Sequence, residues 1–407
     1  MPNTPHIILK PLKEKAVKRH HPWIFSGAIA RVEGKPKPGA LVAIYSSEGE
    51  FLAWSHYSPQ SQIRARLVSW NERADPESRD FWRERLEGAL EGRRPLAADG
   101  TTTAFRLIHA ESDGFPGLIV DQYGETLVAQ YLTVGMEERR DLLNGLLMWM
   151  LHPITLYERS DIDIRQKEGL APRAGLIQGK EPPKYIEVLE NNLGFLVDIQ
   201  QGHKTGFYLD QRENRARLRQ AVERRVQLVE PPRVLNVFSY TGGFGIYAVA
   251  GGAASVTNVD SSAEALRIGW QNLSHNGFAS AAVKDIEGNA FEVLRTLYEK
   301  GHKFEIVILD PPKFAFTQKD VQRAARGYKD INMLALNLLE RNGLLFTFSC
   351  SGAISAELFQ KIVFSAAIDV GRNVQIMDRM TQGIDHPVSL TFPEGDYLKG
   401  LICRVVR

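Results

Sequence analysis

Short apolar runs alternate with longer amphipathic segments through residues 186–407. The apolar runs predict strands at residues 234–239, 255–260, 281–284, 304–310 and 343–349, with helices between them. Strands that alternate with helices in this way are typical of a parallel sheet covered by helices on both faces. We therefore predict a doubly wound, Rossmann-like α/β domain for this part of the chain.

The pattern of residues 1–73 is different. Strands are predicted at residues 41–45, 51–54 and 63–68, and the turn residues Pro36, Pro38, Gly39 and Gly49 lie before or between them. Short strands with such punctuation predict a small β-barrel.

Residues 74–185 predict a central α+β module. A charged amphipathic helix begins near residue 77, and residues 93–95 (Arg-Arg-Pro) are expected to end it. A strand at 127–131 and a helix at 136–150 follow. The chain then becomes polar between residues 166 and 184, which places the next boundary near residue 186.

The composition is that of an ordinary globular protein. Of its residues, 43% are hydrophobic and 24% are charged. A chain of 407 residues is too long to fold around a single hydrophobic core. Two cysteines cannot form a disulfide framework, and no apolar stretch approaches the roughly 20 residues of a membrane span. We expect a cytoplasmic protein with no membrane partner.

The net charge of +2 is too small for the whole molecule to attract nucleic acid, so any such binding requires a local patch. The first twenty residues offer one candidate. They carry Lys10, Lys13, Lys15, Lys18 and Arg19 against the single acid Glu14. This segment is either a phosphate-binding surface or a solvated basic arm.

A glycine-rich loop at residues 238–245 follows the first predicted strand of the last domain and opens a helix, so its backbone can approach a ligand closely. Asp260 ends the next strand, where a carboxylate can accept hydrogen bonds from two ribose hydroxyls. These features do not choose the cofactor, because residues 243–248 also match the G-x-G-x-x-A pattern of dinucleotide binders.

The choice of cofactor comes from residues 310–314, Asp-Pro-Pro-Lys-Phe, directly after an apolar strand. Methyltransferases that act on planar nitrogenous groups commonly carry an acidic residue followed by Pro-Pro there. Consecutive prolines fix the backbone and donate no hydrogen bonds, which leaves carbonyls and the carboxylate to face a base. The alternative is a rigid turn after a buried strand.

Cys350 follows the strand at 343–349, where open α/β sheets place ligands and reacting groups. A thiol in such a cleft can act as a nucleophile, whereas a free cysteine is more commonly a small buried hydrophobe. The surrounding motifs favour the nucleophile.

Taken together, these motifs resemble the bacterial cytosine-5 methyltransferases of large-subunit (23S) ribosomal RNA, of the RlmI type. Residues 21–29 look like the opening of that family's PUA domain, an RNA-binding β-barrel, and residues 204–212 are the most family-specific string. Residues 310–314 and 349–351 complete the set. The resemblance covers nearly the whole chain and implies domains at 1–73 (PUA-like), 74–185 (central module) and 186–407 (methyltransferase).

The resemblance implies S-adenosylmethionine as the cofactor and no metal. The loop 238–242 would line its methionine portion, Asp260 would hold the ribose, and Asp285, which could instead cap a helix, would approach the adenine amino group. Arg212 would donate to the cofactor carboxylate. The implied cofactor-binding residues are Tyr208, Gln211, Arg212, Asn236, Phe238, Tyr240, Thr241, Gly242, Asp260, Ser261, Asp285 and Asp310.

Cytosine C5 is a weak nucleophile, and a thiolate that adds to C6 makes C5 able to attack a sulfonium methyl group. Cys350 is the predicted nucleophile, Asp310 would bond the N3 or N4 edge of the base, and Lys313 or the cofactor's charge would favour the thiolate. The base that removes the C5 proton is not identified. Other cytosine-5 enzymes that act on RNA carry a second cysteine beside the proline of the segment after the fourth strand, and residues 310–313 contain no cysteine. Cys403 lies in an alternating C-terminal strand and is expected in the core.

The expected substrate is naked or partly assembled ribosomal RNA that presents an unstacked base. Predicted RNA contacts are Lys10, Lys13, Arg19 and Arg64 for phosphates and Phe314 for base stacking, although Arg64 and Arg66 could be an ordinary solvent face. Two other functions stay open: methylation of a guanine nitrogen (m7G or m2G) without covalent catalysis, and a non-catalytic RNA-binding role in ribosome assembly. The modified position and the formation of a homodimer are also left open.

Overall fold

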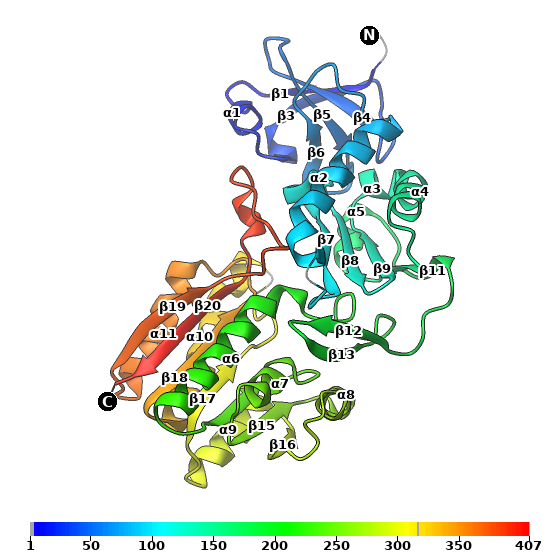
Figure 1. Ribbon diagram of the computed structural model, residues 1–407. Coiled ribbons are helices and arrows are strands. Elements are labelled where there is room, and N and C mark those ends of the chain that lie inside the picture. The colour runs from blue at the N-terminus through cyan, green and yellow to red at the C-terminus, as the bar shows by residue number, and fades with distance from the viewer. Residues whose placement is uncertain (1–3, 99, 316, 407) are drawn as a thin grey trace. The chain divides into compact units, whose positions relative to one another are not determined.

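The computed structural model describes residues 4–98, 100–315 and 317–406 (Figure 1). The chain forms two compact units, and each contains segments from separate parts of the sequence. The first unit consists of residues 1–190, 197–209 and 384–395, and the second of residues 191–196, 210–383 and 396–407. The predicted boundaries near residues 73 and 185 remain predictions.

The first unit begins with a six-stranded sheet in the order β2-β6-β5-β4-β1-β3. Its core contains alternate residues of these strands, such as Ile7 and Leu9 on one strand and Val42 and Ile44 on another. The turn residues named above separate the strands. The elements are β1 (His6–Leu9), α1 (Lys15–Lys18), β2 (Trp23–Phe25), η1 (Ser26–Ala28), β3 (Ile29–Glu33), β4 (Leu41–Tyr45), β5 (Phe51–Tyr57) and β6 (Ile63–Ser69).

A five-stranded sheet in the order β11-β10-β9-β8-β7 follows in the same unit. Two sets of buried residues, from the strands and from the helices α2 and α4, form one core. The elements are α2 (Arg79–Ala98), β7 (Ala104–His109), η2 (Ala110–Asp113), β8 (Leu118–Tyr123), β9 (Thr126–Tyr131), α3 (Val134–Glu138), α4 (Arg140–Leu151), β10 (Thr155–Ser160), α5 (Ile164–Glu168) and β11 (Arg173–Gly179).

Two helix predictions in this region are wrong. Helix α2 does not end at residues 93–95, because it continues to Ala98 with Pro95 inside it. The buried guanidinium of Arg93 donates to both carboxylate oxygens of Asp113, at 2.8 and 2.6 Å, and this contact holds the last turns against the cost of the proline. The helix predicted at 136–150 is two helices, because the helical conformation is interrupted at Arg139. The buried side chain of Arg139 donates to the carbonyls of Gly39 and Gly135, both at 3.0 Å.

The second unit contains a seven-stranded sheet in the order β16-β15-β14-β17-β18-β20-β19 (Figure 1). The first five strands are parallel, and β20 pairs antiparallel with β18 and β19. The elements from residue 186 onward are β12 (Ile186–Glu190), β13 (Leu193–Val197), η3 (Leu209–Gln211), α6 (Arg212–Leu228), β14 (Arg233–Val237), α7 (Gly243–Ala250), β15 (Ser255–Asp260), α8 (Ala263–His275), β16 (Val283–Glu287), α9 (Ala290–Glu299), β17 (Phe304–Leu309), η4 (Gln318–Asp320), α10 (Val321–Leu338), β18 (Leu339–Ser349), α11 (Ala356–Asp369), β19 (Val374–Met380), η5 (Pro393–Gly395) and β20 (Lys399–Val405).

The central strands of this sheet are buried on both faces. In β17, Ile306 and Ile308 pack with residues of α6 and α7, whereas Val307 and Leu309 pack with residues of α9, α10 and α11. A strand covered on both sides needs a continuous apolar run, which is why 304–309 was readable from the sequence. The predicted doubly wound fold is confirmed.

The register of the parallel strands defines the edge at which they all end. Val237 pairs with Val259 and with Leu309, and Leu309 pairs with Thr347. The residues that follow this level are the loop after β14, Asp260, Asp310 and the end of β18 before Cys350. In open α/β sheets ligands bind at this edge, so the fold gathers the predicted chemistry at one place.

Candidate active site

The loop after β14 has an unusual backbone. Phe238 and Tyr240 have positive φ angles of 61° and 47°, and Gly242, with φ 80°, caps the N-terminus of α7. Residues other than glycine adopt this conformation at a cost of about 1–3 kcal/mol, and such strain gathers at binding sites. The loop therefore holds a shape that its sequence alone does not favour.

Asp260 holds this loop in place. Its Oδ2 accepts a hydrogen bond from the backbone N–H of Tyr240 at 2.7 Å, and its Oδ1 accepts one from the N–H of Ser262 at 3.0 Å. The carboxylate is half-buried at the end of β15. Asp260 thus connects the glycine-rich loop to the next strand, at the position predicted for a ribose-binding acid, while the neighbouring Ser261 is exposed.

Two hydroxyl groups in the loop indicate that the site is built for a polar ligand. Ser239 Oγ and Thr241 Oγ1 are buried, and neither has a hydrogen-bond partner among the described residues. Buried hydroxyls normally have partners, so a bound polar group is the expected one. The close approach of Gly269 on α8, whose Cα lies near the loop at Thr241 and Gly242, leaves these hydroxyls on a rigid support. The loop and Asp260 therefore fit the predicted cofactor.

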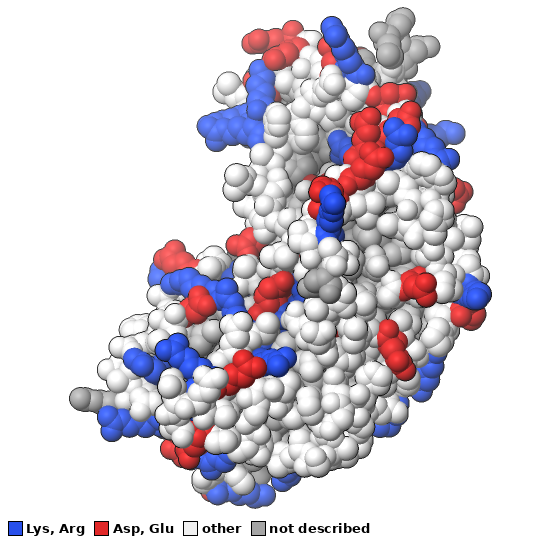
Figure 2. Space-filling view, in the orientation of Figure 1, with Lys and Arg blue, Asp and Glu red and all other residues white. Residues whose placement is uncertain are grey.

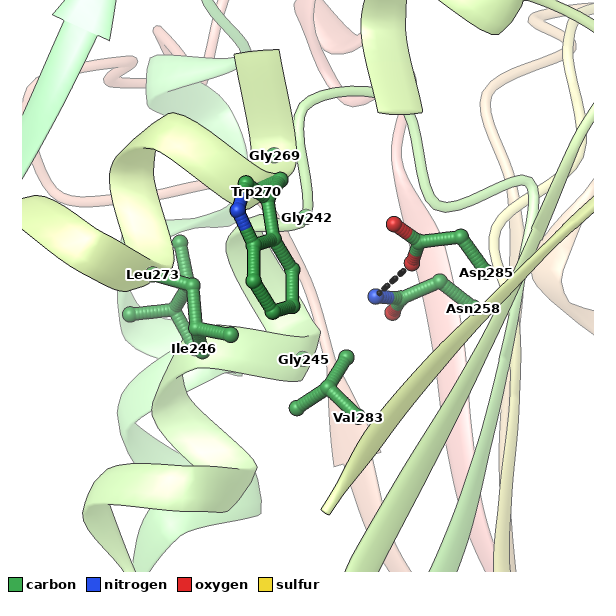
Figure 3. Close-up of a pocket in the computed structure, with 9 residues that line it drawn as sticks. All are labelled: Gly242, Gly245, Ile246, Asn258, Gly269, Trp270, Leu273, Val283 and Asp285. Carbon is green, nitrogen blue, oxygen red and sulfur yellow. Dashed lines mark hydrogen bonds between the residues drawn. The ribbon is translucent and has the colours of Figure 1, made fainter. Parts of the chain in front are cut away.

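An amide network lies just below this edge. Asn236 Nδ2 donates to Asn258 Oδ1 at 2.9 Å, and Asn258 Nδ2 donates to Asp285 Oδ1 at 2.9 Å. The three residues are in register on β14, β15 and β16. Figure 3 shows the Asn258–Asp285 bond at the side of a pocket that Gly242, Gly245 and Trp270 also line.

This network corrects one expectation. Asp285 does not follow the third strand but lies inside β16, two residues before Glu287, which pairs with Asp260. The sequence misplaced the strand end because β16 is an edge strand with exposed polar residues, which carry little hydrophobic signal. Asn258 was missed for a similar reason, since a buried asparagine inside a strand has no sequence motif. Cofactor contact by Asn236 and Asp285 remains a prediction.

The segment after β17 turns across the edge of the sheet. The backbone N–H of Asp310 donates to the carbonyl of Val237 at 3.4 Å, and the Asp310 side chain is half-buried. Lys313 is exposed. Phe314 is half-buried against Tyr328, with ring centroids 4.6 Å apart, so its ring has a packing role alongside the predicted one in base stacking.

Cys350 lies against this segment. Its half-buried thiol is 4.0 Å from the carbonyl oxygen of Pro311, within reach of a weak S–H donor. The next residue, Ser351, is fully buried, and its Oγ accepts from the N–H of Ala315 at 3.2 Å and lies 3.1 Å from the hydroxyl of Tyr328. Hydrogen bonds thus join the segments that follow β17 and β18. Cys350, the predicted nucleophile, therefore lies next to the segment that begins with Asp310, the predicted acid.

Lys399 was missed by the sequence reasoning. It pairs with Ser349 across β18 and β20, and its buried Nζ donates to the carbonyls of Tyr397 at 2.9 Å and Ser351 at 3.4 Å. Burial lowers the pKa of this amine, while the charges of Asp396 and Cys350 raise it and that of Lys313 lowers it. A buried lysine amine therefore bonds the backbone next to the cysteine.

Two further predicted cofactor residues lie at the start of α6. Gln211 is buried and its Oε1 accepts from Asn214 Nδ2 at 2.6 Å, while the buried guanidinium of Arg212 donates to Glu213 at 3.0 Å. Tyr208 belongs to the first unit, where its hydroxyl lies 3.2 Å from His203 Nδ1 and Lys204 lies over its ring. Their contacts with a cofactor stay predictions.

The predicted phosphate contacts also lie in the first unit. Lys10, Lys13 and Arg19 are exposed, and Lys10 donates to the carbonyl of Gly27 at 3.0 Å. Arg64 is half-buried and bonds the carbonyl of Pro59. Arg66 is not part of a solvent face, because it is buried and paired with Glu168 at 2.8 Å. Figure 2 shows basic and acidic side chains interspersed over the visible face.

The chain matches two protein families. Residues 7–70 match the PUA-like domain, and residues 171–382 match the S-adenosylmethionine-dependent methyltransferases. The chain is 48% identical over 392 residues to ribosomal RNA large subunit methyltransferase I of Aeromonas salmonicida, covering 96% of this chain and 97% of that protein. The protein of the same name from Salmonella arizonae is 44% identical, with 100% and 98% covered.

The chain belongs to the ribosomal RNA large subunit methyltransferase I family. Among solved structures, an S-adenosylmethionine-dependent methyltransferase from Streptococcus mutans is 22% identical, with a TM-score of 0.84 over 98% of this chain and all of that one. That likeness supports the fold. Membership of the family confirms the predicted PUA-like domain and S-adenosylmethionine as cofactor. Of the helices within the described ranges, none is long and apolar enough to cross a membrane.

Proposed function

We propose that this methyltransferase acts on C5 of a cytosine in large-subunit ribosomal RNA, with Cys350 as a covalent nucleophile. The observation that carries the proposal is the half-buried Cys350 thiol, 4.0 Å from the carbonyl of Pro311 and adjacent to the Asp310 segment. Methylation of a nitrogen needs no thiol at this edge of the sheet, whereas methylation of C5 does. The names of the relatives support large-subunit RNA as the substrate.

The cofactor, when bound, supplies an electrophilic methyl group. The Cys350 thiolate would add to C6 of the base, which forms an S–C6 bond and moves the C5–C6 π electrons to C5. C5 would then take the methyl group, while the cofactor sulfur keeps the electron pair of the broken S–CH3 bond and leaves as S-adenosylhomocysteine. Asp310 would stabilise the base as this charge develops, either by donating to N3 from its protonated carboxyl group or by accepting from the N4 amino group. A base would then take up the C5 proton, the C5–H electron pair would re-form the C5–C6 double bond, and the S–C6 bond would break to return the thiolate. Lys313 is placed on an exposed turn next to Asp310 and would help to favour the thiolate.

The cofactor would be held by the second unit's loop and its neighbours. Ser239 and Thr241 carry the buried hydroxyls that need a partner, and Asp260 supplies the carboxylate. Gln211 and Arg212 would approach from the start of α6, and contact by Tyr208 stays a prediction. Substrate RNA, naked or partly assembled, would be bound through Lys10, Lys13, Arg19 and Arg64 and stacked on Phe314. A cytoplasmic location is part of the same proposal.

The test is methyl transfer from labelled S-adenosylmethionine to ribosomal RNA from cells that lack this enzyme, followed by nucleoside mass spectrometry. We expect 5-methylcytidine with the wild type and a loss of more than about 1,000-fold with Cys350→Ala. Cys403→Ala is the matched control, because Cys403 is buried in β20 and should leave the rate unchanged. RNA that contains 5-fluorocytosine should trap a covalent adduct on Cys350 only.

Other outcomes identify the alternatives. A methylguanosine product, or full activity of Cys350→Ala, would replace the covalent mechanism with methylation of a guanine nitrogen. Failure of the wild type to bind S-adenosylhomocysteine would favour a non-catalytic RNA-binding role in ribosome assembly.

A further inference from the structure

The Cys350 thiolate needs a positive partner, and the exposed Lys313 is a poor one. A free cysteine is mostly protonated at neutral pH, and a nearby cation that is shielded from water is the usual means of making it reactive. Solvent and salt screen an exposed charge such as that of Lys313. A buried charge is screened much less.

Lys399 is a buried basic residue at this site. Lys399 is 9% exposed, and it lies on β20 opposite Ser349, the residue before Cys350. Its Nζ reaches the carbonyl of Ser351, the residue after the cysteine, at 3.4 Å. The lysine side chain therefore spans the backbone on which Cys350 sits, and the thiol and the ammonium group interact electrostatically.

The hydrogen bonds of Lys399 fix the position of its amine. The carbonyl oxygens of Tyr397 and Ser351 accept from two of its N–H groups, at 2.9 and 3.4 Å. An ammonium group has three N–H donors, so one remains for a further acceptor. Burial has the largest effect on this amine and lowers its pKa from the ordinary value, and the negative charges of Asp396 and of a Cys350 thiolate counter part of that lowering.

We propose that Lys399 is the positioning residue that stabilises the Cys350 thiolate, before any RNA is bound. Its role in the reaction rests on the proposed cytosine-5 mechanism, but its effect on the thiol does not. The other groups that face this pair are Asp396 and Lys313, whose charges act on Lys399, together with Tyr328, which interacts with Cys350, and Asp310 on the adjoining segment. Among these, Lys399 combines a positive charge with burial.

The experiment measures the rate of Cys350 alkylation by iodoacetamide as a function of pH, with no RNA present. The chain has only one other cysteine, and burial raises the pKa of Cys403 to about 12, so labelling reports on Cys350. Cys350→Ser gives the background. We expect Lys399→Met to move the pH midpoint of alkylation upward by about one unit or more, and Lys399→Arg to restore most of the shift because it keeps the charge.

Lys313→Met is the matched control and should move the midpoint much less than Lys399→Met. Binding of S-adenosylhomocysteine checks that each variant is folded. A folded Lys399→Met protein with the wild-type midpoint would overturn the proposal, and so would an equal or larger shift in Lys313→Met.

If Lys399→Met does not fold, the reciprocal measurement decides. Coupling between two groups is mutual, so removal of the thiol in Cys350→Ser must lower the titration midpoint of the Lys399 amine in side-chain NMR. An unchanged lysine titration would contradict the proposal. None of these readouts depends on methyl transfer, so a failure of the cytosine-5 mechanism in the product assay is seen separately.

Discussion

Tyr240 and Asp260 are joined across the edge of the sheet by a hydrogen bond of 2.7 Å, from the backbone N–H of the tyrosine to the carboxylate. Tyr240 is in the left-handed region, with φ 47°, so the bond holds a strained residue. A single carboxylate therefore shapes the loop and also faces the predicted cofactor site.

Replacement of this carboxylate should weaken cofactor binding. We expect Asp260→Asn to reduce affinity for S-adenosylhomocysteine by about 10- to 100-fold, because hydrogen bonds to a charged acceptor are lost and the loop is released. Isothermal titration calorimetry measures the change. Glu264→Gln, on the exposed surface of α8, is the control and should bind normally. Equal affinity of Asp260→Asn and wild type would remove Asp260 from the cofactor site.

The amide network predicts a second effect, on stability. Asn258→Ala leaves the buried Asn236 amide without its acceptor, and we expect the free energy of unfolding to fall by about 2–3 kcal/mol. Asp285 is exposed, and Asp285→Asn keeps an oxygen that can accept from Asn258. This substitution should therefore lower the free energy of unfolding by less than about 1 kcal/mol. Urea unfolding compares the two. A cofactor affinity lowered more than tenfold by Asp285→Asn would show that Asp285 also binds the adenine, as the sequence predicts.

Gly245 on α7 predicts a steric effect at the same network. A Cβ atom at this position would lie 2.6 Å from Asn258 Oδ1, which is too close, and 3.4 Å from Asn236 Nδ2. We expect Gly245→Ala to destabilise the protein by about 1–3 kcal/mol. Gly88→Ala in α2 is the matched change, since nothing lies within 4 Å of its added Cβ, and it should be neutral or stabilising by about 0.5–1 kcal/mol. Equal unfolding midpoints for the two variants would contradict the packing at Gly245.

How far the sequence predicted this site depends on the kind of signal each residue gives. Asp260 and the 310–314 segment follow buried strands with strong apolar patterns, so their place at the edge of the sheet could be predicted. Lys399 could not, because it reaches Cys350 through the antiparallel pairing of β18 with β20, strands about fifty residues apart along the chain. No local pattern records which strand is inserted beside another.

The same limit applies to the domains. The apolar pattern predicts where elements are but not which unit each segment joins, and residues 384–395 join the first unit although the second unit's strands flank them. Their buried contacts explain this. The carboxylate of Asp385 accepts from the backbone N–H of Arg106 at 2.7 Å, and the Asp385 carbonyl accepts from Arg93 at 3.0 Å. Long-range polar contacts of this kind leave no periodic trace in the sequence.

The amino-terminal ends of β14 and β17 predict a dependence of stability on pH. Burial alone would raise the pKa of Glu305, but hydrogen bonds of 2.7 Å from the backbone and the guanidinium of Arg233, together with its charge, lower that pKa below 4.5. Because the folded-state pKa is depressed, this stability is fully present above about pH 4.5 and is lost as the pH falls through the lower folded-state value.

We therefore expect Glu305→Gln to cost about 1 kcal/mol at pH 7, a modest amount because Arg233 is half-exposed, and progressively less as the pH falls below 4.5. Urea unfolding at pH 7, 5 and 4 measures the difference, with the exposed Glu299→Gln as control. A difference between wild type and Glu305→Gln that stays constant over this range would contradict the ion pair.

The basic amino-terminal segment predicts how RNA binding depends on salt. Lys13 and Arg19 are exposed. If each of them contacts a phosphate, replacing one of them by alanine means that RNA binding releases one fewer counterion. For single-stranded RNA the slope of log affinity against log salt should then decrease by about 0.7 per contact, or about 1.4 for the double variant Lys13→Ala/Arg19→Ala.

Lys180→Ala/Lys184→Ala removes the same charge from exposed positions of the same unit and should leave the slope unchanged. Filter binding from 50 to about 300 mM salt distinguishes the two cases. Equal slopes for both variants would mean that the segment is a solvated arm, and a decrease confined to Lys13 and Arg19 would place them on the RNA backbone.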